Sequence, residues 1–149
     1  MHAFTSSLYH CVWSTKDRRP VLTPEIQARL WPYLGGTARA NKTWALAVGG
    51  VADHVHILLS LPSTLTISKA IQLLKGNSSK WLHEEFRDLR SFNWQEGYGA
   101  FTIGMSSVAD TKNYIATQNE HHQKKTFQEK FRSFLDKHGL SYDAATLWD

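Results

Sequence analysis

The sequence has few of the features that mark secreted or membrane proteins. It contains one cysteine, Cys11, so no disulfide can form within the chain and a reducing compartment is expected. No apolar run approaches the ~18 residues of a membrane-spanning helix, and no charged-then-apolar signal pattern opens the chain. Repeats and low-complexity tracts are absent from the sequence as well. We therefore expect one cytoplasmic domain, residues 1–149, that has no membrane partner.

The chain is instead rich in apolar residues and histidines, and it carries a net positive charge. Hydrophobic residues occupy 42% of the 149 positions, enough for a core of ordinary size. The eight histidines and six tryptophans are more than a chain of this length usually carries. Seventeen lysines and arginines against 13 aspartates and glutamates give a formal net charge of +4. This charge suits a polyanionic partner such as nucleic acid, but does not require one.

Two histidines stand two positions apart within residues 53–59, which read DHVHILL. Successive side chains of a strand point to opposite faces, so His54 and His56 are expected on one face. The other face would carry the apolar residues Val55, Ile57 and Leu59 toward a core. Two imidazoles on one rigid strand can bind a metal ion when a third ligand arrives from elsewhere. Taken alone, the spacing favours a half-exposed strand whose polar residues happen to be histidine.

The pattern of apolar residues and turns predicts an alternation of strands and helices. Strands are expected over residues 4–15, 44–51, 54 to about 62, and 100–105, while residues 92–96 fit either a short strand or an ordered loop. The first helix begins at Thr23 and Pro24 and should be kinked or split at Pro32, and further helices cover 63–86, 107–125 and 127–139. This order is the split βαβ plan of a ferredoxin-like antiparallel sheet, an α+β fold with C-terminal helices.

The helix predicted over residues 107–125 has an unusual composition. Ser107 and Asp110 have the spacing of a capping box at its start. Within 110–125 only residues 114–116 are apolar. A helix that packs on a core normally carries a wider apolar stripe. This helix therefore needs another reason to lie against the protein.

Tyr114 and Gln118 lie four residues apart on this helix, about one turn along its axis. A phenol is a poor nucleophile at its free pKa near ~10 and needs a metal ion or a base beside it. Tyr114 is therefore a candidate nucleophile, and Gln118 offers an amide oxygen to a metal ion. The alternative for Tyr114 is a partly buried aromatic residue with one hydrogen bond. For Gln118, His121 and His122 the alternative is a solvated helix face.

Basic side chains at two places are candidates for binding DNA phosphates. Arg18 and Arg19 follow the first predicted strand. Three lysines lie along the predicted helix 63–86, namely Lys69, Lys75 and Lys80. The small polar residues between these lysines would let a phosphate backbone come close. A solvated surface explains each group of charges equally well.

Taken together, these segments resemble the single-tyrosine HUH transposases of bacterial insertion sequences, the IS200-like family. The resemblance rests on the following segments, which occur in family order: 16–22 (KDRRPVL), 51–56 (VADHVH), 74–80 (LKGNSSK), 94–101 (WQEGYGAF), 114–118 (YIATQ), and His121-His122 before 126–129 (TFQE). It extends over nearly the whole chain. As a set, these motifs are highly specific.

The resemblance implies an enzyme that nicks and rejoins single-stranded DNA with a divalent metal ion, Mg²⁺ or Mn²⁺. By position, His54, His56 and Gln118 are the expected metal ligands, and Tyr114 is the nucleophile that forms a 5′-phosphotyrosine bond and leaves a free 3′-hydroxyl. The family is dimeric and recognises hairpins near the element ends. A homodimer, a hairpin-bearing single-stranded DNA partner and a nucleoid-associated location are therefore expected for this chain.

Two alternatives stay open at this point. A non-catalytic single-stranded nucleic-acid-binding protein can use the same sheet plan, with aromatic side chains that stack on bases. A host-retained HUH nickase acting on chromosomal repeats would carry the same site. We also hypothesise that Tyr114 acts in trans, because the polar helix 107–125 is too poor in apolar residues to be held by its own core, and exchange between identical subunits preserves its contacts.

Overall fold

The chain folds into an antiparallel sheet with helices on both faces. The computed structural model describes residues 3–118 and 126–148. The sheet has the strand order β2-β3-β1-β4 and is made of β1 (Leu8–Ser14), β2 (Trp44–Val51), β3 (His54–Ser60) and β4 (Gly99–Thr102). The α-helices are α1 (Pro24–Ala40), α2 (Ile67–Glu85), α3 (Val108–Ala116) and α5 (Phe127–Lys137). Short 3₁₀ helices are η1 (Lys16–Arg18), η2 (Arg87–Leu89) and η3 (Met105–Ser107).

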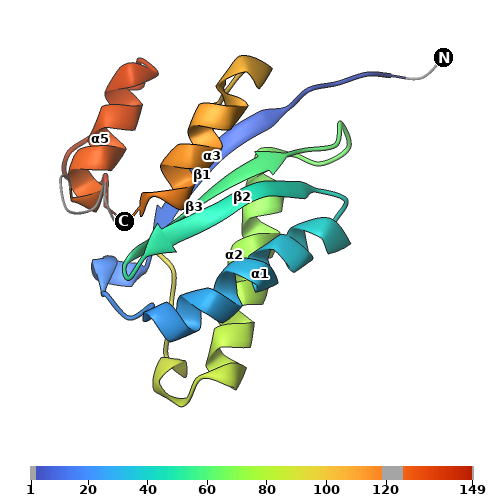
Figure 1. Cartoon of the computed structure of the whole chain (residues 1–149). Coiled ribbons are helices and arrows are strands. Elements are labelled where there is room, and N and C mark those ends of the chain that lie inside the picture. Colours follow the sequence, from blue (N-terminus) through green and yellow to red (C-terminus); the bar gives the residue numbers. More distant parts are fainter. Residues whose placement is uncertain (1–2, 119–125, 149) are drawn as a thin grey trace.

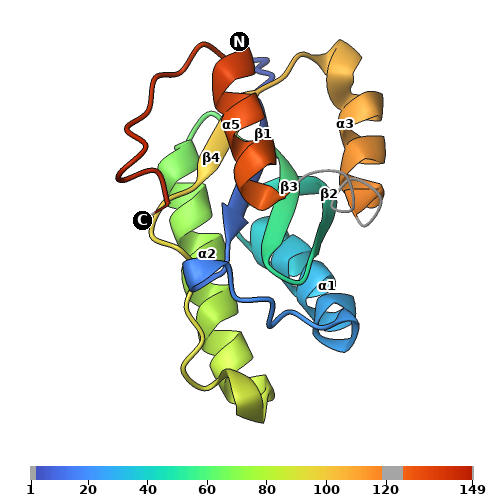
Figure 2. The same cartoon turned by 90° about the vertical axis from the view of Figure 1, so that its left-hand side faces the viewer.

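This connectivity confirms the predicted ferredoxin-like α+β fold. In chain order the sheet is built as β1, α1, β2, β3, α2, β4, and the pairing places β1 and β3 at its centre. Figures 1 and 2 show α1 and α2 on one face, with α3 and α5 on the other. The C-terminal helices therefore add a second layer rather than extending the sheet. No helix among the described residues is long and apolar enough to cross a membrane.

The two faces of the sheet are covered by cores of different size. The main core lies between the sheet and α1 and α2, and its buried members on the strands include Cys11, Trp13, Val55, Ile57 and Leu59. A smaller cluster on the opposite face joins Val12 and Phe101 to three residues of α5, which are Phe127, Phe131 and Leu135. The C-terminal residues Leu147 and Trp148 pack against this smaller cluster. It holds α5 over the sheet.

Helix α1 begins as predicted but is not split at Pro32. The Thr23 hydroxyl accepts a hydrogen bond from the backbone N–H of Ile26 (3.4 Å), and Pro24 occupies the first turn. The helix then runs unbroken to Ala40 through Pro32. Proline removes one backbone hydrogen bond, whereas Leu30 and Leu34 on either side of it are completely buried in the main core. Tertiary packing therefore outweighs the local defect.

The predicted capping box at Ser107 is wrong. The Ser107 side chain makes no capping hydrogen bond, and its backbone is already helical (φ −96°, ψ −1°) rather than extended. Its carbonyl instead accepts a hydrogen bond from the hydroxyl of Thr111 (2.7 Å). Helix α3 is shorter than the predicted 107–125 and ends at Ala116. His121 and His122 lie outside the described residues.

Boundaries shift elsewhere as well. The predicted helix 63–86 begins at residue 67, after the cap Thr66, whose hydroxyl accepts from the Lys69 N–H (3.2 Å). The predicted strand 100–105 is the four-residue β4. Within 92–96, Trp94 forms an isolated bridge to Thr15, so this segment is an ordered connection beside the end of β1.

Candidate functional site

The histidine pair lies at the centre of the sheet on the face covered by α3 and α5. His54 and His56 are both fully buried, and their ring centroids lie 5.1 Å apart. The intervening residues Val55 and Ile57 belong to the main core on the other face. The predicted division of β3 into two faces is therefore confirmed. A half-exposed strand is excluded, because the second helical layer covers both rings.

Asp53 orients the His54 ring. Its carboxylate oxygen lies 2.6 Å from Nδ1 of His54. A carboxylate only accepts hydrogen bonds, so Nδ1 carries the proton and Nε2 presents its lone pair toward the second layer. Burial lowers the pKa of His54, and the charge of Lys130 acts in the same direction, while the bond to Asp53 opposes them. The ring is therefore neutral at pH 7, the state in which imidazole binds metals.

His10 on β1 holds the second ring in a similar way. Its Nε2 lies 2.8 Å from Nδ1 of His56, and the two rings share a buried hydrogen bond. Burial, followed by the neighbouring charges of His138 and Lys137, lowers the pKa of His10 to about 4. A neutral His10 can accept the Nδ1 proton of His56, which again leaves Nε2 of His56 as the ligating atom. No local sequence pattern indicates this role, because the β1–β3 register that brings His10 to His56 is a tertiary property.

Tyr114 lies on this histidine cluster. Its ring centroid is 5.6 Å from that of His56 and 5.8 Å from that of His10, with both contacts edge-on. The phenol is half-buried; burial raises its pKa, and a hydrogen bond from Gln118 acts in the opposite direction. Tyr114 therefore rests as a neutral phenol beside the two rings.

Helix α3 is held by the sheet of its own chain, contrary to expectation. Ile115 is 1% exposed and packs over Gly49 of β2. A Cβ at position 49 would lie 2.5 Å from the Ile115 carbonyl oxygen, so only glycine allows so close an approach. One buried side chain and one glycine thus replace the missing apolar stripe. Exchange of α3 between two copies would preserve this contact, so the hypothesis that Tyr114 acts in trans stays a prediction.

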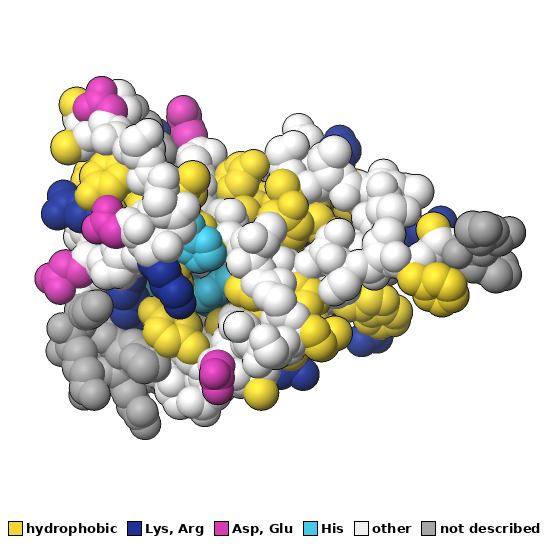
Figure 3. All heavy atoms as spheres, turned by 90° about the horizontal axis from the view of Figure 1, so that it is seen from above, with side chains coloured by type: hydrophobic (Ala, Val, Ile, Leu, Met, Phe, Trp, Pro, Cys, Tyr) yellow, Lys and Arg dark blue, Asp and Glu magenta, His cyan; other side chains and the backbone are white. Residues whose placement is uncertain are grey.

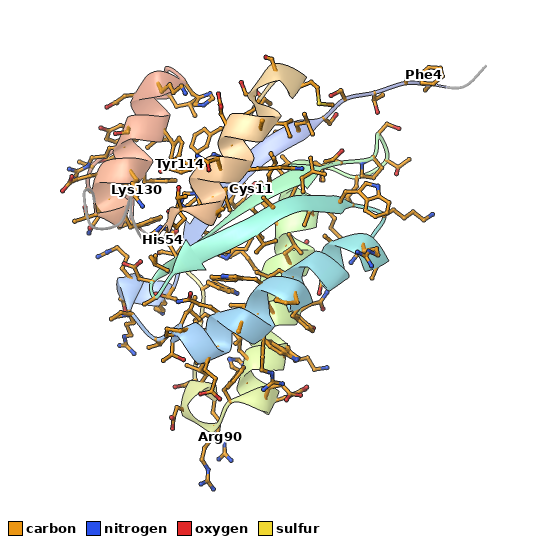
Figure 4. The ribbon with its side chains drawn as sticks, in the orientation of Figure 1. Phe4, Cys11, His54, Arg90, Tyr114 and Lys130 are labelled. Carbon is orange, nitrogen blue, oxygen red and sulfur yellow. The ribbon has the colours of Figure 1, made fainter. Side chains whose placement is uncertain are left out.

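Gln118 is almost completely buried and joins α3 to α5. Its Nε2 donates to the backbone carbonyl of Tyr114 (2.9 Å), and its Oε1 accepts from Nζ of Lys130 (3.0 Å). Lys130 comes from α5 and is 4% exposed. Figure 4 shows His54, Tyr114 and Lys130 converging between the sheet, α3 and α5, with Arg90 at the far end of the molecule. The sequence does not indicate that Lys130 belongs to the site, because it occupies what looks like a polar position of an ordinary amphipathic helix.

The predicted DNA-binding residues fall into two separate places. Arg18 and Arg19 lie beside the turn before His54, because the backbone N–H of Thr15 donates to the Asp53 carbonyl (2.9 Å) and the Leu22 N–H to the Ala52 carbonyl (3.0 Å). Lys69 and Lys80 are exposed on α2, which covers the opposite face of the sheet. The structure therefore brings only the arginines near the histidine pair.

Lys75 points into the protein rather than outward. Its Nζ donates to the backbone carbonyls of Gln95, Glu96 and Gly97 at 2.5–3.1 Å. Burial lowers its pKa to about 8, and the nearby charge of Glu96 opposes that shift. Because its donors are engaged by these three carbonyls, Lys75 fastens the loop beside β1 to α2.

A pocket opens next to Tyr114, between α3, α5 and β4. Its volume is about 520 Å³, and its polar lining includes His10, Asp110, Tyr114, Lys137 and His138. Figure 3 looks onto this side of the molecule and shows histidine side chains with lysine or arginine side chains next to them. Tyr114 is thus one of the side chains that line this pocket.

The sequence of this chain is similar to those of known transposases. Residues 3–118 match the sequence model of the family described as "Transposase IS200 like". The transposases for insertion sequence element IS200 of Salmonella typhimurium and Salmonella typhi are each 32% identical over 125 residues, which is 80% of this chain and 81% of theirs. The ISDra2 transposase TnpA of Deinococcus radiodurans is 27% identical over 117 residues, 75% of this chain and 84% of its own.

Two solved structures are similar as well. A putative transposase from Deinococcus radiodurans superposes with a TM-score of 0.66 at 27% identity, covering 79% of this chain and 95% of that one. A REP-associated tyrosine transposase bound to a REP hairpin gives a TM-score of 0.61 at 14% identity, covering 82% and 72%. The second similarity concerns the fold alone.

Proposed function

The chain belongs to the IS200-like transposase family, and on that basis we propose that it cuts and rejoins single-stranded DNA through a covalent bond to Tyr114, with the help of a divalent metal ion. The observation that carries this proposal is the convergence of four side chains in one covered site. His54 and His56 lie side by side on β3; Tyr114 reaches them from α3, and Gln118 from the segment just after that helix. Each of the four has a place in the predicted chemistry.

The donor set fits a divalent ion. No group of three His, Cys, Asp or Glu side chains that could hold a metal occurs in residues 3–118 and 126–148, so a ligand of another type is needed. Nε2 of His54 and His56, each set by a bond at Nδ1, would serve with Oε1 of Gln118. Such an ion supplies neutralisation of the charge that builds on the phosphate oxygens during attack. Two neutral imidazoles and an amide leave its charge undiminished and suit Mn²⁺ as well as Mg²⁺.

The reaction is an exchange of phosphodiester bonds. The Tyr114 oxygen attacks the scissile phosphorus, the bond to the 3′ oxygen breaks, and the phenol proton is lost as the leaving oxygen gains one. A 5′-phosphotyrosine bond and a free 3′-hydroxyl result. Attack by a second 3′-hydroxyl reverses these steps, joins a new pair of strands and restores the phenol. Because one ester replaces another, no nucleotide needs to be hydrolysed.

DNA would be held on both faces of the molecule. Arg18 and Arg19, beside the turn before His54, are placed to contact phosphates near the cut. Lys69 and Lys80 on α2 are placed to contact DNA farther away. A solved tyrosine transposase of similar fold is bound to a REP hairpin, which supports a hairpin-bearing partner for this chain. We propose a homodimer as the working form.

A nicking assay tests the proposal. Labelled single strands from the ends of the protein's own genetic locus are incubated with Mg²⁺ or Mn²⁺, with excess chelator as the control. Cleavage that needs metal and is lost in Tyr114→Phe is expected. Binding of these strands without cleavage in either metal would overturn the enzyme assignment and favour a non-catalytic binding protein.

A further inference from the structure

Lys130 is the buried charge that the proposed reaction does not use. Its side chain is 4% exposed, and its Nζ lies 3.0 Å from Oε1 of Gln118, the atom expected to bind metal. The positive charge of Lys130 also acts on His54, another expected ligand, because it lowers the pKa of that imidazole. An ammonium group thus stands among the groups that would hold a divalent ion.

Folding alone gives little reason for a charge at this position. Helix α5 is anchored by Phe127, Phe131 and Leu135, which belong to the smaller core. Burying an ammonium group costs hydration. The apolar anchors of α5 do not themselves require a charge at position 130. The contact of Nζ with Oε1 of Gln118 points instead to a role in the site.

We propose that Lys130 competes with a divalent ion for one ligand oxygen. Its ammonium group holds Oε1 of Gln118 in the protein without metal, and the ion needs the same oxygen. This inference rests on the metal-dependent function proposed above. The two cations repel each other strongly when both lie within ~3 Å of one oxygen, because the surroundings are covered from solvent. Nζ must move away before Gln118 can bind metal. Lys130 therefore weakens metal affinity while keeping the empty site ordered.

The experiment is a calorimetric titration of the full chain with Mn²⁺. Lys130→Met keeps the side-chain volume and removes the ammonium group, and should tighten the Kd by about tenfold or more, since the repulsion is lost. Lys112→Met is the matched control, since it removes an exposed lysine charge from the neighbouring helix α3, outside the site. Its Kd should stay within about twofold of wild type. Circular dichroism and thermal unfolding establish that Lys130→Met is folded.

A double-mutant cycle separates competition for Gln118 from general charge repulsion. In a Gln118→Met background, the further change Lys130→Met should improve the Kd by less than about threefold, because the contested oxygen is gone. An equal improvement in Kd in the wild-type and Gln118→Met backgrounds would mean that Lys130 acts by general charge repulsion. That result would overturn the proposed competition for Oε1.

The outcomes also distinguish this inference from the function on which it rests. If the wild type binds Mn²⁺ and nicks DNA while folded Lys130→Met binds Mn²⁺ equally or more weakly, Lys130 is not a competing cation. If neither protein binds Mn²⁺, the metal site itself is wrong.

Discussion

The two faces of β3 show how one strand serves two purposes. Val55, Ile57 and Leu59 point into the main core with α1 and α2. His54 and His56, one position away along the same backbone, point into a covered polar site beneath α3 and α5. The strand is fixed by its apolar face, so the histidines need not contribute to hydrophobic packing. Packing on the opposite side of the sheet therefore makes this part of the site rigid.

The polar face is also organised by paired contacts rather than by bulk packing. Asp53 bonds to His54, His10 to His56, and Lys130 to Gln118. Buried polar groups are stable when their hydrogen bonds are made. The two histidine rings are therefore held in fixed orientations by their Nδ1 contacts, which suits the preorganised site proposed above.

The largest expected difference between the two faces is in how substitutions affect cleavage and stability. Tyr114→Phe changes the polar face, and Ile57→Ala changes the apolar face. Removing the phenol oxygen removes the nucleophile, so cleavage should fall at least about a thousandfold, while the lost contact with Gln118 should change the unfolding free energy by no more than about 1.5 kcal/mol. Ile57→Ala should instead lose about 2–5 kcal/mol of stability through the cavity it leaves, and keep its cleavage rate per folded molecule. Nicking assays and urea unfolding measure both. Near-normal cleavage by Tyr114→Phe would contradict the assignment.

Mixing inactive subunits tests whether α3 serves its own sheet or that of a second copy. His56→Ala should abolish nicking by removing a ligand, and Tyr114→Phe by removing the nucleophile. If Tyr114 acts in trans, exchanged mixed dimers contain one complete site, and activity should recover to about a quarter of wild type. If confirmed exchange restores nothing, the helix acts on its own chain.

The polar face should also make the metal-free protein sensitive to acid. Folding lowers the pKa of His10 from 6.5 to about 4, so between these values the unfolded chain binds more protons than the folded one. This contribution to stability is complete above pH 6.5 and is lost as the pH falls toward 4. From pH 6.5 to 5 the loss should be about 2 kcal/mol. Urea unfolding should show a shallower pH dependence in His10→Gln, and an unchanged slope would argue against a neutral buried His10.

Smaller effects are expected from two lysines of α2. Lys69→Ala should flatten the dependence of DNA binding on salt by about one unit and leave stability unchanged. From the sequence alone, Lys75→Ala is predicted to weaken DNA binding in the same way. The three carbonyl contacts of Lys75 predict instead a loss of about 1–3 kcal/mol in unfolding free energy. Salt-dependent binding and chemical unfolding of both variants separate these roles.

Local patterns were enough to predict the order of the elements, the cap at Thr23 and the two faces of β3. Each depends on residues close in sequence. Other roles depend on partners far away in sequence, so no local pattern reveals them. The partner of His10 is 46 residues away, that of Lys130 is 12 residues away, and those of Lys75 are at least 20 residues away. The docking of α3 was missed for a related reason. The glycine that admits it, Gly49, lies on β2, far from Ile115 in sequence.

Mass spectrometry of the protein after reaction would show whether Tyr114 forms the proposed covalent bond to DNA. Wild-type protein is incubated with a single strand from the element end and Mn²⁺, digested, and searched for a peptide that carries nucleotide mass. We expect one modified peptide, with the mass on Tyr114, absent in chelator and in Tyr114→Phe. A modification on another residue, or cleavage without any covalent adduct, would contradict it.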